Sequence, residues 1–247
     1  MDSLKGNIAL VTGSSRGIGR ASALKLAGLG ASVIFHGSRP SENLQSAVAE
    51  AGGDARSMTA DLCKTPEVEA LAGTLIREAL VPDILVLNAS VQSYMGIENH
   101  DEAEASRMFH ANVESSCILL SRLLPEMRKK GHGRVIFVGS INAIQPAPRL
   151  AIYGATKAAL MNIARTAALE NAPYGITVNT ILPGVIETDR NKAALSNQEF
   201  AEGLKRQIPM HRFGTAEECA ELIAFLATPS ASYITGAEIP IAGGWQL

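Results

Sequence analysis

The chain has 247 residues, of which 47% are hydrophobic and 19% are charged, and its formal net charge is −2. This length suits one large α/β domain or two small ones, and the composition provides a sizeable core, which excludes a disordered chain. The near-neutral charge argues against nucleic acid or an acidic membrane as the main partner.

Short apolar runs alternate along the chain with helical stretches. Strands are predicted at residues 7–12, 32–36, 55–60, 83–88, 134–139, 176–182 and 238–241. Helices are predicted at residues 17–29, 41–50, from 65 onward, 102–130, 150–170 and 216–226. Repeated β-α units imply an α/β fold with a parallel sheet, helices on both faces and right-handed crossovers.

Two local signals refine this pattern. Thr65 before Pro66 predicts a helix start, with Thr65 as the capping residue and Pro66 as the first helical residue. Residues 187–211 are polar, are bounded by Pro183 and Pro209, and lack a clear core pattern. Such a segment in an α/β enzyme is a candidate substrate lid, and a plain surface excursion is an equally open interpretation.

Cysteine spacing and hydropathy bear on location and on metals. Cys63, Cys117 and Cys219 lie far apart and form neither a CxxC pair nor a metal-ligand spacing. The first apolar run, residues 8–11, is too short for a signal-peptide core, and no run approaches membrane-spanning length. We therefore expect a reduced cytoplasmic protein without a metal site.

A glycine-rich turn at residues 12–19 joins the first strand to the first helix. Glycine permits positive φ and lets a ligand approach the backbone closely, and the helix that follows offers free N–H groups and a positive dipole end to a pyrophosphate. The spacing is GxxxGxG rather than GxGxxG, but its place at the start of a β-α-β unit predicts a dinucleotide site.

Tyr153 and Lys157 are four residues apart, so they share one face of the helix predicted at residues 150–170. An ammonium ~4 Å from the phenol, at an effective dielectric of ~20, favours the phenolate by ~4 kcal/mol. That attraction would move the pKa of Tyr153 from ~10 toward ~7, and burial would oppose it. The pair predicts a proton-transfer group, and the alternative is two side chains that merely share a helix face.

Together, these motifs resemble those of the short-chain dehydrogenase/reductase family over essentially the whole chain. The glycine turn matches the family pattern TGxxxGIG. The other matching positions are the adenine-site dipeptide Asp61-Leu62, the signature Asn88-Ala89-Ser90, the tetrad Asn112, Ser140, Tyr153 and Lys157, and Pro183-Gly184 with Val185 to Thr188. The resemblance implies a Rossmann-type doubly wound sheet of about seven strands, with residues 1–247 forming one dinucleotide-binding and catalytic domain.

The resemblance also implies roles for these residues. Ser140 would hydrogen-bond the substrate oxygen, and Tyr153 would exchange a proton with that oxygen. Lys157 would lower the pKa of Tyr153 and hold the nicotinamide ribose, and Asn112 would bind a water that connects Lys157 to solvent. Taken singly, Ser140 could be a helix cap and Asn112 a solvated helix residue. The implied cofactor contacts are Gly13, Ser15, Arg16, Gly17, Ile18, Gly19, Ser38, Arg39, Asp61, Leu62, Asn88, Ala89, Ser90, Tyr153, Lys157, Pro183, Gly184, Ile186 and Thr188.

Two details bear on the reaction type. Ser90 stands where the family usually has glycine, so pocket shape or nicotinamide contacts would change, although related reductases carry serine there. The interval of four between Tyr153 and Lys157, together with Ser140, favours carbonyl or alcohol chemistry, because the enoyl-reductase branch of the family uses a longer interval.

The end of the second strand bears on the choice of dinucleotide. NAD-preferring proteins of this architecture hold the ribose 2′-hydroxyl with an acidic residue there, and this chain has none. Arg39, Ser38 and Arg16 are placed to meet a 2′-phosphate, and the planar arginine fork suits phosphate. The sequence therefore predicts NADP(H) over NAD(H), unless the two arginines are only solvated surface charges.

Among substrates, the chain resembles most the reductases of 3-oxoacyl thioesters on acyl carrier protein. Residues 128–130 and 132–134 are rich in basic side chains that could receive an acidic carrier protein, or could simply cap a helix C-terminus. Tyr174 counts against the carrier, because such reductases usually have a basic residue there. The alternatives are an NADP-dependent dehydrogenase of a small ketone, sugar, polyol or steroid, and a non-catalytic NADP-binding regulator.

The resemblance implies a homotetramer with 222 symmetry, built from the two long helices and the C-terminal end. Trp245 and Leu247 suggest contact with another subunit, and docking within the chain is the alternative. The small residues expected to admit a partner helix are Ala155, Ala158, Ala159, Ala164, Ala167 and Ala168.

Overall fold

The computed structural model describes residues 3–247, with only the backbone described at residues 193–195. The described strands form one seven-stranded parallel sheet in the order β3-β2-β1-β4-β5-β6-β7. The strands are β1 (Ile8–Val11), β2 (Ser32–Gly37), β3 (Arg56–Thr59), β4 (Ile84–Leu87), β5 (Gly133–Val138), β6 (Ile176–Pro183) and β7 (Glu238–Ile241). The predicted α/β fold of the Rossmann type is therefore confirmed.

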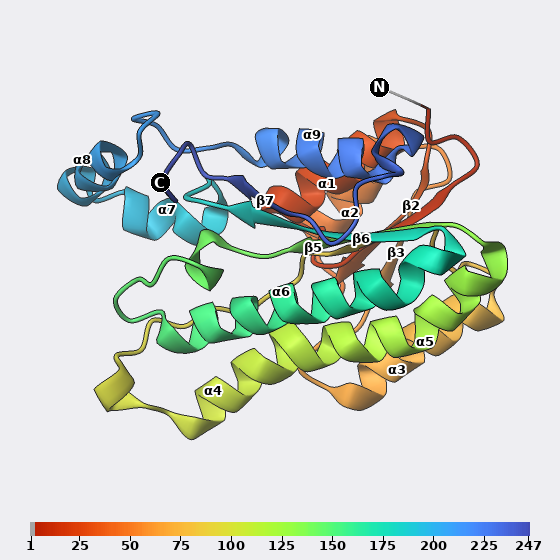
Figure 1. Cartoon of the computed structure of the whole chain (residues 1–247), viewed down its shortest axis with the longest axis horizontal. Helices are drawn as coiled ribbons and strands as arrows, with labels where there is room; N and C mark the ends of the chain where they lie inside the picture. The colour runs from red at the N-terminus through yellow and green to blue at the C-terminus, as the bar shows by residue number, and fades with distance from the viewer. Residues whose placement is uncertain (1–2) are drawn as a thin grey trace.

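Helices cover both faces of the sheet (Figure 1). They are α1 (Gly17–Gly28), α2 (Glu42–Ala51), α3 (Thr65–Arg77), α4 (Glu102–Phe109), α5 (Ser115–Lys130), α6 (Ala151–Asn171), α7 (Asp189–Leu195), α8 (Gln198–Gln207) and α9 (Ala216–Ala227). One layer holds α1, α2 and α9, and the opposite layer holds α3, α5 and α6. None of the helices in the described part of the chain is both long and apolar enough to cross a membrane.

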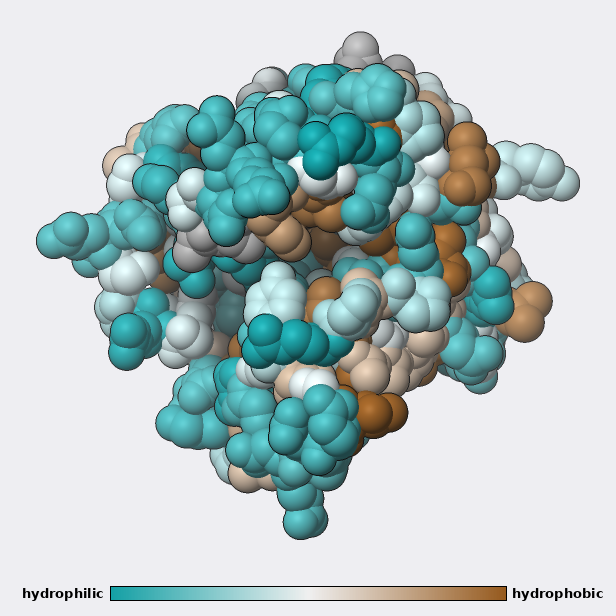
Figure 2. Space-filling view, turned by 90° about the vertical axis from the view of Figure 1, so that its left-hand side faces the viewer, coloured by the Kyte–Doolittle hydropathy of each residue, from teal (hydrophilic) through white to brown (hydrophobic). Residues whose placement is uncertain are grey.

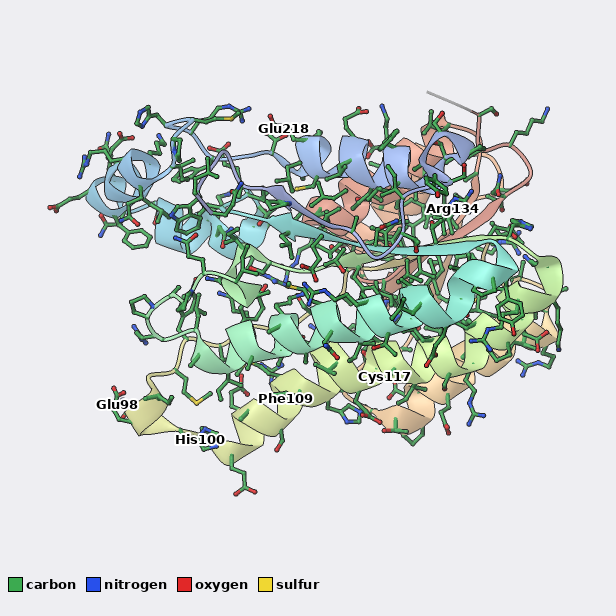
Figure 3. All side chains as sticks on the ribbon, viewed as in Figure 1. Glu98, His100, Phe109, Cys117, Arg134 and Glu218 are labelled. Carbon is green, nitrogen blue, oxygen red and sulfur yellow. The ribbon has the colours of Figure 1, made fainter. Side chains whose placement is uncertain are left out.

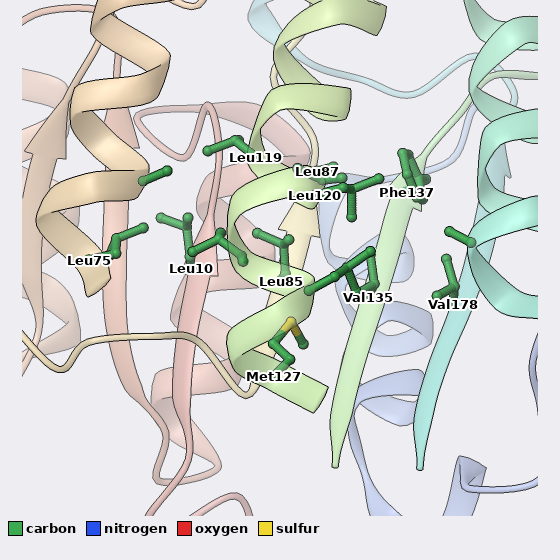
Figure 4. Close-up of a cluster of buried hydrophobic side chains, with 14 of the residues drawn as sticks. Leu10, Leu75, Leu85, Leu87, Leu119, Leu120, Met127, Val135, Phe137 and Val178 are labelled. Atoms are coloured by element: carbon green, nitrogen blue, oxygen red, sulfur yellow. The ribbon is translucent and has the colours of Figure 1, made fainter. Parts of the chain in front are cut away.

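The core lies between the sheet and these two layers. Successive strand residues point to opposite faces, so Leu10 and Phe137 pack with α3, α5 and α6 (Figure 4), whereas Val11 and Ile136 pack with α1 and α9. Both faces of the central strands are thereby buried, as is typical of a parallel sheet. This packing fixes the carboxyl ends of β1, β4, β5 and β6 along one edge, where ligands of such folds bind.

Two helix predictions need correction. The α3 helix begins at Thr65, its capping position is Lys64, and Thr65 provides no cap, so the predicted cap is wrong. The Thr65 hydroxyl instead lies 3.3 Å from Nε2 of His110. The long helix predicted at residues 102–130 is α4 and α5 joined by a π-helical turn, His110–Glu114.

The segment at residues 187–211 is mostly helical, although its sequence lacks a core pattern. It contains α7 and α8, which lie at one end of the sheet beside the C-terminus (Figure 1). A small cluster of Ala201, Ile208 and Phe213, joined by Trp245, holds this segment to the body of the protein. Trp245 therefore docks within its own chain, in line with the alternative interpretation of that residue.

Candidate active site

The carboxyl ends of the strands open into a cavity of about 890 Å³. Figure 2 looks onto this end of the molecule, where a hollow opens in a largely hydrophilic surface. All of the predicted cofactor contacts line the cavity except Arg39, and three of the four tetrad residues line it, Asn112 being the exception. The fold thus gathers residues from the glycine turn, the ends of the five strands β2 to β6, and α6 into one site.

The glycine turn is packed tightly against the end of β4. A Cβ atom on Gly13 would lie 2.9 Å from Cα of Ala89, and one on Gly19 would lie 2.3 Å from the Gly13 oxygen, so neither position admits a side chain. The Thr12 hydroxyl accepts hydrogen bonds from the backbone N–H of Asn88 at 2.9 Å and of Ala89 at 3.0 Å. These contacts fix the turn against the strand that carries the Asn88 signature.

His36 anchors the same turn to β2 and β3. Its Nδ1 accepts a hydrogen bond from the Gly13 N–H at 3.1 Å, and its Nε2 lies 3.1 Å from the Ala60 carbonyl, which can only accept. The ring is therefore neutral, with its proton on Nε2. Burial lowers the pKa of His36 to about 4, with the Ala60 hydrogen bond opposing that change. Protonating Nδ1 would break the bond that holds the turn.

This arrangement predicts acid sensitivity. Since the folded-state pKa of about 4 lies below the ordinary 6.5, the contribution of His36 is complete above pH 6.5 and is lost as the pH falls toward 4. The full loss is about 3 kcal/mol. We expect His36→Gln to flatten the fall in thermal midpoint between pH 6.5 and pH 4.5. Parallel curves for the two proteins would contradict this assignment.

Ser140, Tyr153 and Lys157 converge at the other end of the cavity, and all three are buried. The Lys157 ammonium donates a hydrogen bond to the Val138 carbonyl at 2.8 Å and lies 5.7 Å from the Tyr153 ring centre. Ser140 Oγ accepts a hydrogen bond from the Asn142 N–H at 3.1 Å, so it also caps a short 3-10 turn. The helical spacing of Tyr153 and Lys157 thus brings both to the end of β5.

The pKa values of this pair differ from the sequence-based expectation. Burial raises the pKa of Tyr153, while Arg190 and the Ser140 hydroxyl oppose that rise. Burial, followed by the charge of Arg190, lowers the pKa of Lys157 to about 7. The expected drop of the Tyr153 pKa toward neutrality is therefore wrong for the free protein, because desolvation outweighs the opposing effects of Arg190 and Ser140.

Asn112 lies fully buried in the π-helical turn, so the solvated alternative is wrong. Its side chain accepts a hydrogen bond from the Val91 N–H at 2.7 Å and donates to the Val91 carbonyl at 2.9 Å. A third bond runs from its Nδ2 to the Thr156 hydroxyl at 3.1 Å. Asn112 thereby ties the loop after β4 to α6, beside Lys157.

The chemistry of the cavity suits a phosphorylated dinucleotide. The N-terminus of α1 has no side-chain cap and no acidic residue in its first turn, so its N–H groups can meet a pyrophosphate. Arg16 and Ser38 line the cavity near this turn. Arg39 is exposed beside Ser38, and neither arginine side chain has an ion-pair partner among the described side chains.

Sequence reasoning missed three features of the site. His36 gave no signal beyond its place in a strand. Arg190 and Arg149, which also line the cavity, lie in segments without periodicity. The Arg190 side chain donates hydrogen bonds to the Ser90 hydroxyl at 3.1 Å and to the Ser90 carbonyl at 2.7 Å. Only its nearness to Thr188 in the chain could have suggested that it reaches the site.

Comparisons with known proteins agree with this geometry. The family model described as "Enoyl-(Acyl carrier protein) reductase" matches residues 13–246. Dehydrogenase/reductase SDR family member 4 from Homo sapiens is 36% identical over 247 residues, covering 98% of this chain and 88% of that protein. A solved 3-oxoacyl (acyl-carrier-protein) reductase from Agrobacterium tumefaciens C58 with NADP bound has a TM-score of 0.93 at 35% identity, covering 98% of this chain and 95% of that one.

A further solved structure is a protein from Agrobacterium tumefaciens provisionally described as a gluconate dehydrogenase. It has a TM-score of 0.95 at 32% identity, covering 99% of this chain and 97% of that one. Fold, site and comparisons together define an oxidoreductase that acts on CH–OH and C=O groups. The chain belongs to the short-chain dehydrogenase/reductase family.

Proposed function

We propose that the protein catalyses the reversible NADPH-dependent reduction of a ketone to a secondary alcohol. The observation that carries this proposal is one cavity with an uncapped helix N-terminus at one end and Ser140, Tyr153 and Lys157 at the other. When bound there, NADPH would supply the hydride, and the protein would supply geometry and proton transfer.

In this proposal the three side chains act on the substrate oxygen. The Ser140 hydroxyl donates a hydrogen bond that orients the carbonyl, and the Tyr153 phenol donates the proton. The raised pKa keeps Tyr153 protonated at neutral pH, which suits an acid in the reduction direction. Lys157 holds the nicotinamide ribose and returns a proton toward Tyr153, and Asn112 positions the water that links Lys157 to solvent.

The interval between Tyr153 and Lys157 favours one of two branches of the family. The matching family model takes its description from enoyl reductases. This chain combines an interval of four with a buried Ser140 in the same cavity, the arrangement that the resemblance associates with carbonyl chemistry. We therefore propose C=O rather than C=C reduction.

For the substrate, we propose a 3-oxoacyl thioester first, supported by the likeness to the reductase from Agrobacterium tumefaciens C58. The basic residues expected to bind a carrier protein are mostly engaged within the chain. Lys129 pairs with Glu126, Lys130 pairs with Asp83, and Arg128 stacks on Tyr174. This engagement favours the second candidate, a small polar ketone such as an oxidised sugar.

A substrate panel separates these candidates. NADPH oxidation would be followed with a 3-oxoacyl thioester, short ketones, keto sugars and a keto steroid. The first proposal expects the thioester to have the highest kcat/KM, and the second expects a small polar ketone to exceed it. A protein that binds NADPH but reduces none of them would be the non-catalytic regulator instead.

We further propose a single cytoplasmic domain in which α7 and α8 act as the substrate lid, and a homotetramer. Free thiols at Cys63, Cys117 and Cys219 support a reducing compartment.

The outer face of α6 carries Ala155, Ala158 and the 80% exposed Leu169. Phe109 is also exposed on the helical layer that contains α4 (Figure 3). In contrast, Ala164, Ala167 and Ala168 are buried in the core of their own chain.

The assembly proposal predicts a mass close to four times the 26.0 kDa of one chain. We expect Leu169→Glu to lower that mass, because it would place a charge where apolar area is to be buried. Light scattering at micromolar concentration measures both proteins. A wild-type monomer would contradict the tetramer.

A further inference from the structure

Arg190 reaches from the lid into the chemical end of the cavity. It lies in the first turn of α7, and its guanidinium donates to both the hydroxyl and the carbonyl of Ser90, on the loop after β4. It lines the same cavity as Tyr153 and Lys157, and its positive charge contributes to lowering the pKa of each. The guanidinium therefore lies beside the groups that would handle the substrate oxygen.

Ser90 explains how this position is held. A glycine there would offer Arg190 only the backbone carbonyl, whereas the serine hydroxyl provides a second acceptor. A guanidinium has five N–H donors in a fixed planar fork, and the two bonds to Ser90 leave the others available. Ser90, which departs from the family pattern, thus orients Arg190. It leaves some of the guanidinium N–H groups of Arg190 available to a ligand.

The charges around this end of the cavity are mainly positive. Arg149 and Arg190 both line it, and neither forms an ion pair with a carboxylate among the described side chains. Asp189 is the one acidic lining residue near Arg190, since Asp61 belongs to the opposite, adenine end. Both arginines are exposed, and a cavity-lining cation without a carboxylate partner can bind an anionic ligand.

We propose that Arg190 binds a carboxylate of the substrate, so that the protein prefers short oxo acids to neutral ketones. This inference rests on the proposed ketone reduction and develops its second candidate, the small polar ketone, rather than the thioester. The guanidinium would take the carboxylate through its unused N–H groups while Ser140 and Tyr153 engage the ketone oxygen. An acyl thioester has no free carboxylate, so this specificity would rank oxo acids above it.

The test compares each oxo acid with its methyl ester, using levulinate and methyl levulinate as the stable reference pair. In the wild type, kcat/KM for the acid should exceed that for the ester by ~10-fold or more, the range of charged hydrogen bonds. Arg190→Met should remove most of this preference by raising KM for the acid, with the ester changed less than ~3-fold. Arg190→Lys should retain part of it, because the charge remains but the fork is lost.

Arg206→Met is the matched control. Arg206 is an exposed arginine of α8 that does not line the cavity, so its loss should leave the acid preference unchanged. A second readout is inhibition by pentanoate, which cannot be reduced. It should compete with methyl levulinate in the wild type and lose that competition in Arg190→Met, whereas pentanamide should inhibit neither protein.

Two outcomes would overturn the inference and leave the proposed function standing. One is equal kcat/KM for acid and ester in the wild type. The other is an Arg190→Met variant that loses activity equally toward the acid and the ester. Arg190 would then serve only to hold α7 against the loop that carries Ser90. Absence of NADPH oxidation with every ketone, together with unchanged pentanoate binding, would instead refute the proposed function.

Discussion

Replacing Tyr153 by phenylalanine is expected to reduce turnover by ~10²-fold or more while NADPH binding is retained. The substitution removes one hydroxyl and keeps a ring that is only 6% exposed, so the packing of α6 should survive. Under the proposed mechanism, the phenol is the group that gives a proton to the substrate oxygen. The rate of NADPH oxidation measures turnover, and quenching of Trp245 fluorescence, from a residue that lines the cavity, measures binding.

Tyr233→Phe provides the control for this experiment. Tyr233 is fully exposed and does not line the cavity, so the same chemical change there should leave turnover unchanged. If Tyr153→Phe retained near-normal turnover, another group would have to supply the proton, and the assignment of Tyr153 would be wrong. Loss of NADPH binding in this variant would point to a structural role instead.

The second large effect concerns the choice of dinucleotide. We expect kcat/KM for NADPH to exceed that for NADH by at least ~10²-fold, which needs only ~2.7 kcal/mol. Two charge-assisted contacts to a 2′-phosphate, from Arg39 and Arg16, would contribute up to ~3–6 kcal/mol before solvent screening reduces them. Arg39→Asp should remove most of the preference, because it would repel the phosphate and offer the ribose an acceptor.

A charge-matched control is available on the neighbouring strand. Arg56 is exposed at the start of β3, whereas the cavity lies at the strand ends, so Arg56→Asp changes the net charge equally without touching the ribose. The preference of the Arg56→Asp variant for NADPH over NADH should equal that of the wild type. Equal activity of the wild type with both dinucleotides would refute the role of Arg39 and leave the catalytic assignment intact.

Much of the fold and the site can be predicted from local patterns. The apolar runs predict the central strands, and the glycine turn predicts the start of α1. Both patterns are formed by residues that are close together in the sequence, so they can be recognised without the structure. The interval of four likewise places Tyr153 and Lys157 on one helix face, since helical periodicity alone determines which side chains share a face. The family resemblance adds most of the other residues that line the cavity.

Other features depend on contacts between distant parts of the chain. His36 reaches Gly13 across 23 positions, and Arg190 reaches Ser90 across 100, so no local pattern could reveal either. The pKa of Tyr153 departs from the expected direction because burial is a tertiary property. The predicted Thr65 cap is wrong because helix α3 begins one residue earlier than the Thr-Pro pair suggests, a shift within the ordinary uncertainty of helix ends.

The central claim is hydride delivery from a reduced dinucleotide to a ketone carbon at this site. NADPH deuterated at the transferable position of its nicotinamide would be incubated with the wild-type protein and each ketone of the panel. Mass spectrometry of the product would show whether the label reaches the carbinol carbon. The proposed function predicts a singly deuterated alcohol from at least one ketone, formed by the wild type and not by Tyr153→Phe. Unlabelled alcohol, or no alcohol from any ketone, would contradict it.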